Sequence, residues 1–125
     1  INVSGHYGLV TGERRKMDLF YKAKAVRLRS HHLKYLTAEE DEETVIQDRD
    51  GASKNAKWTV EFINPEKNST TIRLKSCYNK YLTASNERFL LGMTGRKVLQ
   101  TDLSQSSVEW EPIREGNRVK LRTKK

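Results

Sequence analysis

One short stretch of sequence occurs twice in this chain and limits its fold more than any other feature. Residues 26–38 read Val-Arg-Leu-Arg-Ser-His-His-Leu-Lys-Tyr-Leu-Thr-Ala, and residues 72–84 read Ile-Arg-Leu-Lys-Ser-Cys-Tyr-Asn-Lys-Tyr-Leu-Thr-Ala. A third copy begins at residue 119 with Val-Lys-Leu-Arg-Thr. A period of roughly 20–50 residues is typical of chains in which each repeat forms one supersecondary unit packed against its neighbours.

Each repeat has the residue pattern of four short strands. In residues 25–30 apolar and charged side chains alternate, so the arginines face away from the apolar residues. Residues 39–43 are all carboxylates, which predicts an exposed loop because adjacent charges cannot be buried together. Asp50-Gly51 predicts a tight turn in which the glycine takes a positive φ. The predicted strands are 25–30, 35–38, 44–47 and 58–63, then 71–75, 81–84, 98–101 and 108–113, with a mixed loop at 85–88 and a glycine-rich crossing at 92–97.

Repeats of about 45 residues, each with four strands and a tryptophan near its end, predict an all-β fold, the β-trefoil. In this fold six strands form a short barrel and hairpins cap one end of it. The repeats at 20–66, 67–116 and 117–125 make the predicted domain, residues 17–125, an incomplete trefoil with two full four-stranded repeats and the first strand of a third. Missing strands leave edges unpaired, so we expect this chain by itself to be marginally stable. The predicted structural core is Leu28, Leu36, Trp58, Leu74, Leu82 and Trp110.

Residues 1–16 show no periodicity and predict a disordered leader, or a stretch translated upstream of the true start. A basic binding arm is the functional alternative for these residues. The charge on the rest of the chain is uneven. Residues 17–63 carry eight basic and nine acidic side chains, whereas residues 64–125 carry thirteen basic and six acidic ones. This asymmetry favours an acidic or polyanionic partner. No apolar run reaches the roughly 20 residues of a membrane span, and the single Cys77 cannot form an internal disulfide, so the sequence predicts a cytoplasmic protein.

Two sets of residues resemble known families. Lys-Tyr-Leu-Thr-Ala at residues 34–38 and 80–84 resembles the fascin-type trefoil motif. Residues 22–32, 53–58 and 108–113 resemble a plant family of unknown function with a fascin-like, actin-cross-linking-type fold, and this likeness extends over residues 17–123. The resemblance implies a trefoil from a plant cell, and it implies actin binding by analogy of fold.

The sequence therefore predicts a non-enzymatic fascin-like binding module, with filamentous actin as the protein partner and basic side chains as the contacts. Lys34 and Lys80 are equivalent in the two repeats, and further cations lie on outward positions of the first strands, where they can meet an acidic filament. The candidate partner-binding residues are Lys34, Lys80, Arg96, Lys97, Arg118, Lys120 and Arg122. The outward first-strand cations also include Lys22, Lys24, Arg27, Arg29, Arg73 and Lys75.

Two alternative partners remain. A polyanion or nucleic acid would suit the basic half, although no exposed aromatic residues interleave with the cations as stacking platforms do. A carbohydrate would suit some trefoils, but the ricin-type lectin motif places Gln two residues before Trp, where this chain has Ala56 and Val108.

The sequence predicts no catalytic, metal or cofactor site. His31 and His32 are adjacent, so in a strand they would point to opposite faces and could not chelate one ion. Cys77 lies in a repeat turn without a recognisable base or oxyanion-binding loop around it. The carboxylates at 39–43 lack the spaced oxygens and central glycine of a calcium loop.

Overall fold

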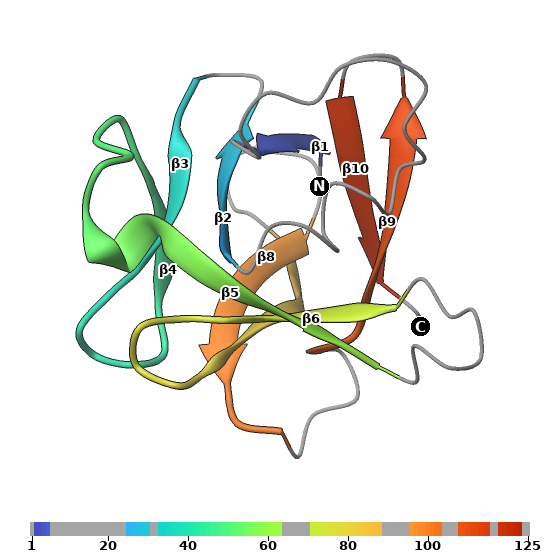
Figure 1. Cartoon of the computed structure of the whole chain (residues 1–125). Helices are drawn as coiled ribbons and strands as arrows, with labels where there is room; N and C mark the ends of the chain where they lie inside the picture. The colour runs from blue at the N-terminus through green and yellow to red at the C-terminus, as the bar shows by residue number, and fades with distance from the viewer. Residues whose placement is uncertain are drawn as a thin grey trace.

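The computed structural model describes residues 2–5, 25–30, 33–63, 71–88, 96–103, 108–115 and 118–123. These residues form ten strands and one turn of 3-10 helix, η1 (Lys54–Ala56) (Figure 1). No helix in this part of the chain is long and apolar enough to cross a membrane. The strands are β1 (Asn2–Gly5), β2 (Ala25–Ser30), β3 (Tyr35–Ala38), β4 (Val45–Asp48), β5 (Lys57–Phe62), β6 (Ile72–Lys75), β7 (Tyr81–Arg88), β8 (Arg96–Thr101), β9 (Trp110–Glu115) and β10 (Arg118–Thr123).

The predicted strands of both repeats are present in the predicted order, and two of them are longer than expected. β7 continues to Arg88 through the predicted loop at 85–88, and β8 begins at Arg96, inside the predicted crossing. The two strands pair from Tyr81↔Thr101 to Arg88↔Arg96, with an irregularity after Ala84. Such a hairpin is held by main-chain hydrogen bonds, so it can extend through residues that lack an apolar alternation.

Six of the strands form a closed antiparallel ring. Around the ring, β2 pairs with β5, β5 with β6, β6 with β9, β9 with β10, β10 with β1, and β1 with β2. The remaining strands form the hairpins β3–β4 and β7–β8, which join the ring through β2 and β6. The first and last strands of each full repeat therefore build the ring, and its middle strands build the hairpins.

β1 closes the ring and corrects one prediction. Residues 2–5 were expected to belong to a disordered leader, but they lie between β2 and β10, with Val3 opposite both Ser30 and Val119 (Figure 1). Strand pairing is made by main-chain groups, and two open edges accept a segment that has no side-chain pattern. The sequence predicted that missing strands would leave edges unpaired, but β2 and β10 are both paired here. Residues 1 and 6–16 of the predicted leader lie outside the described residues.

The register of β1 matches that of the last strand in each full repeat. Trp58 pairs with Val26, Trp110 pairs with Ile72, and Val3 pairs with Val119, which is the equivalent residue of the third repeat. Val3 therefore holds the ring position that a tryptophan holds in the other two repeats. β1 therefore lies at the ring position that the last strand takes in each of the two full repeats.

The core lies inside this ring. The equivalent leucines Leu28, Leu74 and Leu121 are 0%, 0% and 1% exposed. The indole nitrogen of Trp58 donates to the Leu36 carbonyl at 3.0 Å, and that of Trp110 donates to the Leu82 carbonyl at 2.9 Å. The two tryptophans thus satisfy their polar atoms in the same way in both repeats. All six residues predicted to form the core are buried: Leu28, Leu36, Trp58, Leu74, Leu82 and Trp110.

The turns at Leu33, Asn79 and Gly51 differ in their backbone conformation and in the space they leave for a side chain. Leu33 and Asn79, equivalent residues of the first two repeats, have φ of 63° and 61°, the left-handed region that asparagine tolerates better than leucine. Gly51 does not take the predicted positive φ. A side chain there would put Cβ 2.5 Å from the Tyr35 ring, so the glycine makes room for an aromatic ring.

One buried polar residue joins the two full repeats. Gln100 on β8 is 1% exposed, and its side-chain nitrogen donates to the carbonyls of Glu39 and Thr44 at 3.0 and 3.1 Å. Its side-chain oxygen accepts a hydrogen bond from the Ser76 hydroxyl at 2.8 Å. The acidic loop of the first repeat is therefore anchored on the second repeat, while residues 40–43 are exposed as predicted.

Candidate binding surface

The predicted partner-binding cations are spread over several elements. Lys34 and Lys80 are half-buried and lie in the equivalent turns before β3 and β7. Arg122 on β10 is exposed, but its guanidinium lies 2.9 Å from the carboxylate of Glu111 on β9. The strands β8 and β10 contain the other four, Arg96, Lys97, Arg118 and Lys120, whose side chains lie outside the described part.

A second group of cations lies on the outside of the ring. In β2 and β6 the larger apolar residues are buried and the charged residues between them are half-buried, because strand side chains alternate between faces. The outer side of β2, β5 and β6 carries one carboxylate, Glu61, among five cations. We call this surface the basic face, and its cations are Arg27, Arg29, Lys57, Arg73 and Lys75.

Part of the charge on this face is neutralised within the domain. The ammonium group of Lys75 lies 3.1 Å from the Glu61 carboxylate, which also accepts a hydrogen bond from the Tyr81 hydroxyl at 2.9 Å. The contact with Glu61 raises the pKa of Lys75. Burial, together with the hydrogen bond to Glu61, raises the pKa of the Tyr81 phenol. Glu61, Lys75 and Tyr81 therefore form a cross-strand cluster in which Lys75 keeps its positive charge and the Tyr81 phenol keeps its proton at neutral pH.

Arg73 and Arg27 occupy the same position in two repeats but have different neighbours. Arg73 lies 3.8 Å from Glu109, the residue before Trp110. Arg27 lies directly opposite Lys57, the residue before Trp58. In the third repeat the same position pairs Lys120 with Asn2. The first repeat thus places two like charges where the second repeat has an ion pair.

Arg27 is held by main-chain oxygens instead of a carboxylate. Its Nη1 donates to the carbonyls of Gly51 and of Ser53, the latter at 2.7 Å. Neither Arg27 nor Lys57 forms an ion pair with any residue in the described ranges. Two like charges directly opposite each other on adjacent strands are destabilising, so this pair costs the free domain stability.

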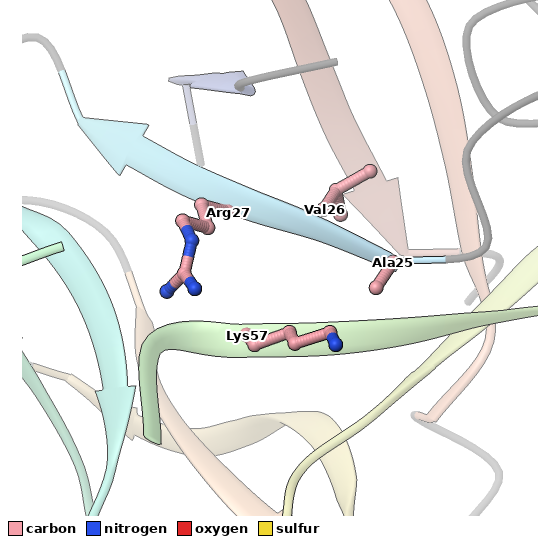
Figure 2. Close-up of a pocket in the computed structure, with 4 residues that line it drawn as sticks. All are labelled: Ala25, Val26, Arg27 and Lys57. Atoms are coloured by element: carbon pink, nitrogen blue, oxygen red, sulfur yellow. The ribbon is translucent and has the colours of Figure 1, made fainter. Parts of the chain in front are cut away.

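An open hollow of about 170 Å³ lies beside this pair and is lined by Ala25, Val26, Arg27 and Lys57. Figure 2 shows Arg27 reaching from β2 toward the start of β5, while Lys57 lies along β5 with its ammonium group on the side of Ala25. Ala25 lies beyond the ammonium group in this view, and its small side chain adds to the open space of the hollow. A water molecule takes about 30 Å³ of liquid volume, so the hollow has room for a small ion with some of its hydration.

One residue of this surface, Lys57, and one buried residue, Gln100, were missed by the sequence analysis. Lys57 was not among the candidates, although alignment of the repeats on their tryptophans sets it against Glu109 and reveals the change of charge. Gln100 carried no signal, because a single glutamine in a strand looks like an outward-facing polar residue. Its burial depends on the packing of one repeat against the other.

Cys77 and the acidic loop, two further candidates from the sequence, both lie in the described part of the chain. No group of three or more His, Cys, Asp or Glu side chains that could hold a metal ion occurs among the described residues. Cys77 is exposed in the turn between β6 and β7. Asp41, the central carboxylate of the acidic loop, accepts hydrogen bonds from the Thr44 hydroxyl and from the amides of Glu43 and Thr44. These bonds, the Thr44 hydroxyl first, lower the pKa of Asp41 and hold the loop in place.

Comparison with known proteins agrees with this architecture. A solved structure of a Caenorhabditis elegans protein with unknown function is similar, with a TM-score of 0.53, 19% identity, and coverage of 70% of this chain and 56% of that one. The chain thus spans little more than half of that protein, and at this identity the likeness shows the fold alone. A comparison with the curated proteins found no match. The family model described as a beta-trefoil domain of unknown function (DUF569) matches residues 17–125, which leaves β1 ahead of the match, and the chain therefore belongs to this family of β-trefoil domains.

Proposed function

We propose that this β-trefoil is a non-enzymatic binding module that docks an acidic protein surface on its basic face, with filamentous actin in the cytoplasm as the partner. The observation that carries the proposal is the unneutralised pair of Arg27 and Lys57 on the outside of a closed ring. The fascin-like repeats at residues 34–38 and 80–84 support actin as the candidate. A fold of this kind hosts many functions, so the partner has to be tested directly.

The physical basis is charge complementarity on a rigid surface. A ring of paired strands holds its outward side chains in fixed positions, so cations on three neighbouring strands can face one acidic surface together. Arg27 is oriented in advance by its bonds to two carbonyls, which reduces the side-chain entropy lost on binding. Complementary charge mainly raises the rate of association and the specificity. Salt screens this attraction over a Debye length of about 8 Å at physiological ionic strength.

Co-sedimentation with filamentous actin at physiological salt tests this proposal. We expect the wild-type chain to pellet with filaments, and we expect Lys57→Glu to weaken the interaction by about tenfold, because a reversed charge removes one attraction and adds one repulsion. Lys54→Glu is the matched control, since it makes the same charge change on η1 at a residue outside both the basic face and the turn lysines, and Lys80→Glu tests the turn lysines as the alternative binding residues.

The outcomes separate the alternatives. If the wild-type chain does not pellet with actin, the proposed partner is wrong. If Lys80→Glu or Lys34→Glu abolishes pelleting while Lys57→Glu leaves it intact, the turn lysines are the binding residues and the basic face is not. If binding to RNA or heparin is tighter than binding to actin and falls steeply with salt, the domain is a polyanion-binding module instead.

A further inference from the structure

The internal repeats show that the like-charged pair of Arg27 and Lys57 is specific to the first repeat, because the equivalent position differs in the others. The sheet position before Trp58, Trp110 or Val3 faces the first-strand cation each time: Lys57 faces Arg27, Glu109 faces Arg73, and Asn2 faces Lys120. A glutamate at this position is therefore compatible with the fold. The first repeat has a lysine there and bears the repulsion.

Departures from local rules of this kind are expected where a protein binds something, since the missing charge then arrives with the ligand. In the second repeat one cation at this position is balanced by one negative charge, because Arg73 lies beside the carboxylate of Glu109. Arg27 and Lys57 together carry two positive charges beside one hollow. The group that balances both is a doubly charged anion.

The two side chains suit the same kind of group. A guanidinium presents several N–H donors in a plane that fits the oxygens of a phosphate, and Arg27 has donors on Nη2 and Nε besides the Nη1 that holds the loop carbonyls. A lysine ammonium group acts as a flexible point charge, and Figure 2 shows it at the other side of the hollow. A phosphate monoester carries a charge of about −1.5 to −2 at pH 7, which matches this pair.

We propose that the hollow between Arg27 and Lys57 is a subsite for one phosphate monoester group. The proposal rests on the docking role given above to the basic face, and it adds the chemical group that this part of the face takes. Arg27 binds the phosphate oxygens from one end of the hollow, and Lys57, whose ammonium group points toward Ala25 in Figure 2, turns on its flexible stem to bind them from the other. The ligand chemistry is shared by a phosphorylated side chain of a partner protein and by a free phosphate compound.

The test is a titration of the ¹⁵N-labelled chain with inorganic phosphate, followed by two-dimensional NMR of the backbone amides of β2 and β5 and of the Arg27 Nε–H. Sodium acetate at the same ionic strength is the comparison anion. We expect saturable shifts confined to the hollow, with a Kd for phosphate on the order of 1–10 mM, the range given by a few charge-assisted hydrogen bonds. Acetate is expected to bind at least about tenfold more weakly, because it carries half the charge.

The decisive variant is Lys57→Glu, which copies the arrangement of Arg73 and Glu109. It is expected to weaken phosphate binding by more than about tenfold and to keep or raise the urea midpoint, because an ion pair replaces a repulsion. Lys54→Glu makes the same charge change on η1, outside the hollow lining, and is expected to keep the phosphate Kd within about twofold. If Lys57→Glu lowers the urea midpoint, Lys57→Met removes the charge while keeping most of the aliphatic stem.

Two further arms distinguish the source of the phosphate. A peptide carrying one phosphoserine is compared with the same peptide unphosphorylated and with free O-phosphoserine. If only the phosphopeptide binds more tightly than inorganic phosphate, the ligand is a phosphorylated protein segment. If free O-phosphoserine binds as tightly as the phosphopeptide, the ligand is a small phosphate compound.

Equal shifts with phosphate and acetate would overturn the subsite, as would unchanged phosphate binding by Lys57→Glu. If phosphate fails to bind while actin pelleting still depends on Lys57, this inference is wrong and the proposed function stands. If phosphate binds while actin does not pellet, the reverse holds.

Discussion

Exchanging Gln100 for glutamate tests whether a buried hydrogen-bond network joins the two full repeats. The substitution keeps the shape of the side chain but replaces the nitrogen, which donates to the carbonyls of Glu39 and Thr44, with an oxygen. The bond from the Ser76 hydroxyl, 2.8 Å long, can persist. In its neutral form the introduced carboxyl has one O–H, so it can satisfy one of the two carbonyls, and the lost bond costs about 1 kcal/mol.

Ionisation adds a larger penalty that depends on pH. The site is 1% exposed and two carbonyl oxygens face it, so the charged form is disfavoured and the pKa of the introduced carboxyl rises above the unfolded value of about 4.3. A carboxyl whose folded pKa is raised loses stability as pH increases from the unfolded pKa to the folded one. The loss is about 1.4 kcal/mol per pH unit, which reaches about 3.7 kcal/mol at pH 7 if the folded pKa is 7 or above.

The expected total is therefore a destabilisation of about 4–5 kcal/mol at pH 7 and about 1.5 kcal/mol near pH 4.5. Urea unfolding of the variant and the wild type at both pH values measures it, with the fluorescence of the buried Trp58 and Trp110 as the signal. The wild type measured in parallel removes the contribution of the exposed acidic loop. Gln100→Met is the control, because it breaks the same three bonds without adding a charge, and its cost of about 3 kcal/mol is expected to be independent of pH.

The reasoning is refuted if the glutamate variant unfolds at the wild-type urea concentration, which would mean that Gln100 is not enclosed between the repeats. It is also refuted if the glutamate and methionine variants lose the same free energy of unfolding at both pH values.

Three further predictions concern the backbone. Leu33→Asn is expected to stabilise the chain by about 0.5–1 kcal/mol, because asparagine tolerates the positive φ and Leu33 is 65% exposed. Asn79→Leu is expected to destabilise the chain by a similar amount, and thermal unfolding measures both effects. Val3→Pro removes a main-chain donor between two paired strands and is expected to lower the free energy of unfolding in urea by about 1–3 kcal/mol, whereas an unchanged midpoint would show that residues 2–5 do not close the ring. Gly51→Ala pushes Cβ into the Tyr35 ring and is expected to cost about 1–3 kcal/mol in the same assay, and a neutral result would show that this ring moves freely.

Much of the fold was predictable from residue order. The alternation of Val26, Arg27, Leu28 and Arg29 identified a strand and its buried face, and the repetition of this stretch identified the equivalent strand at 72–75. The positions of Trp58 and Trp110 in the repeats placed both in the core, where each donates to an equivalent leucine carbonyl. These features follow from local periodicity, which depends only on the sequence because strand side chains alternate wherever the strand lies.

The closure of the ring, the burial of Gln100 and the charge pair on the basic face were decided by tertiary structure. β1 is held by main-chain pairing to β2 and β10. Because every residue other than proline carries the same main-chain donor and acceptor, no side-chain pattern predicts this strand. Arg27 and Lys57 are 30 residues apart and meet only because β2 and β5 pair in one register. A sequence determines which residues can form strands, whereas which charges face each other across the strands depends on a pairing that exists only once the whole ring has formed.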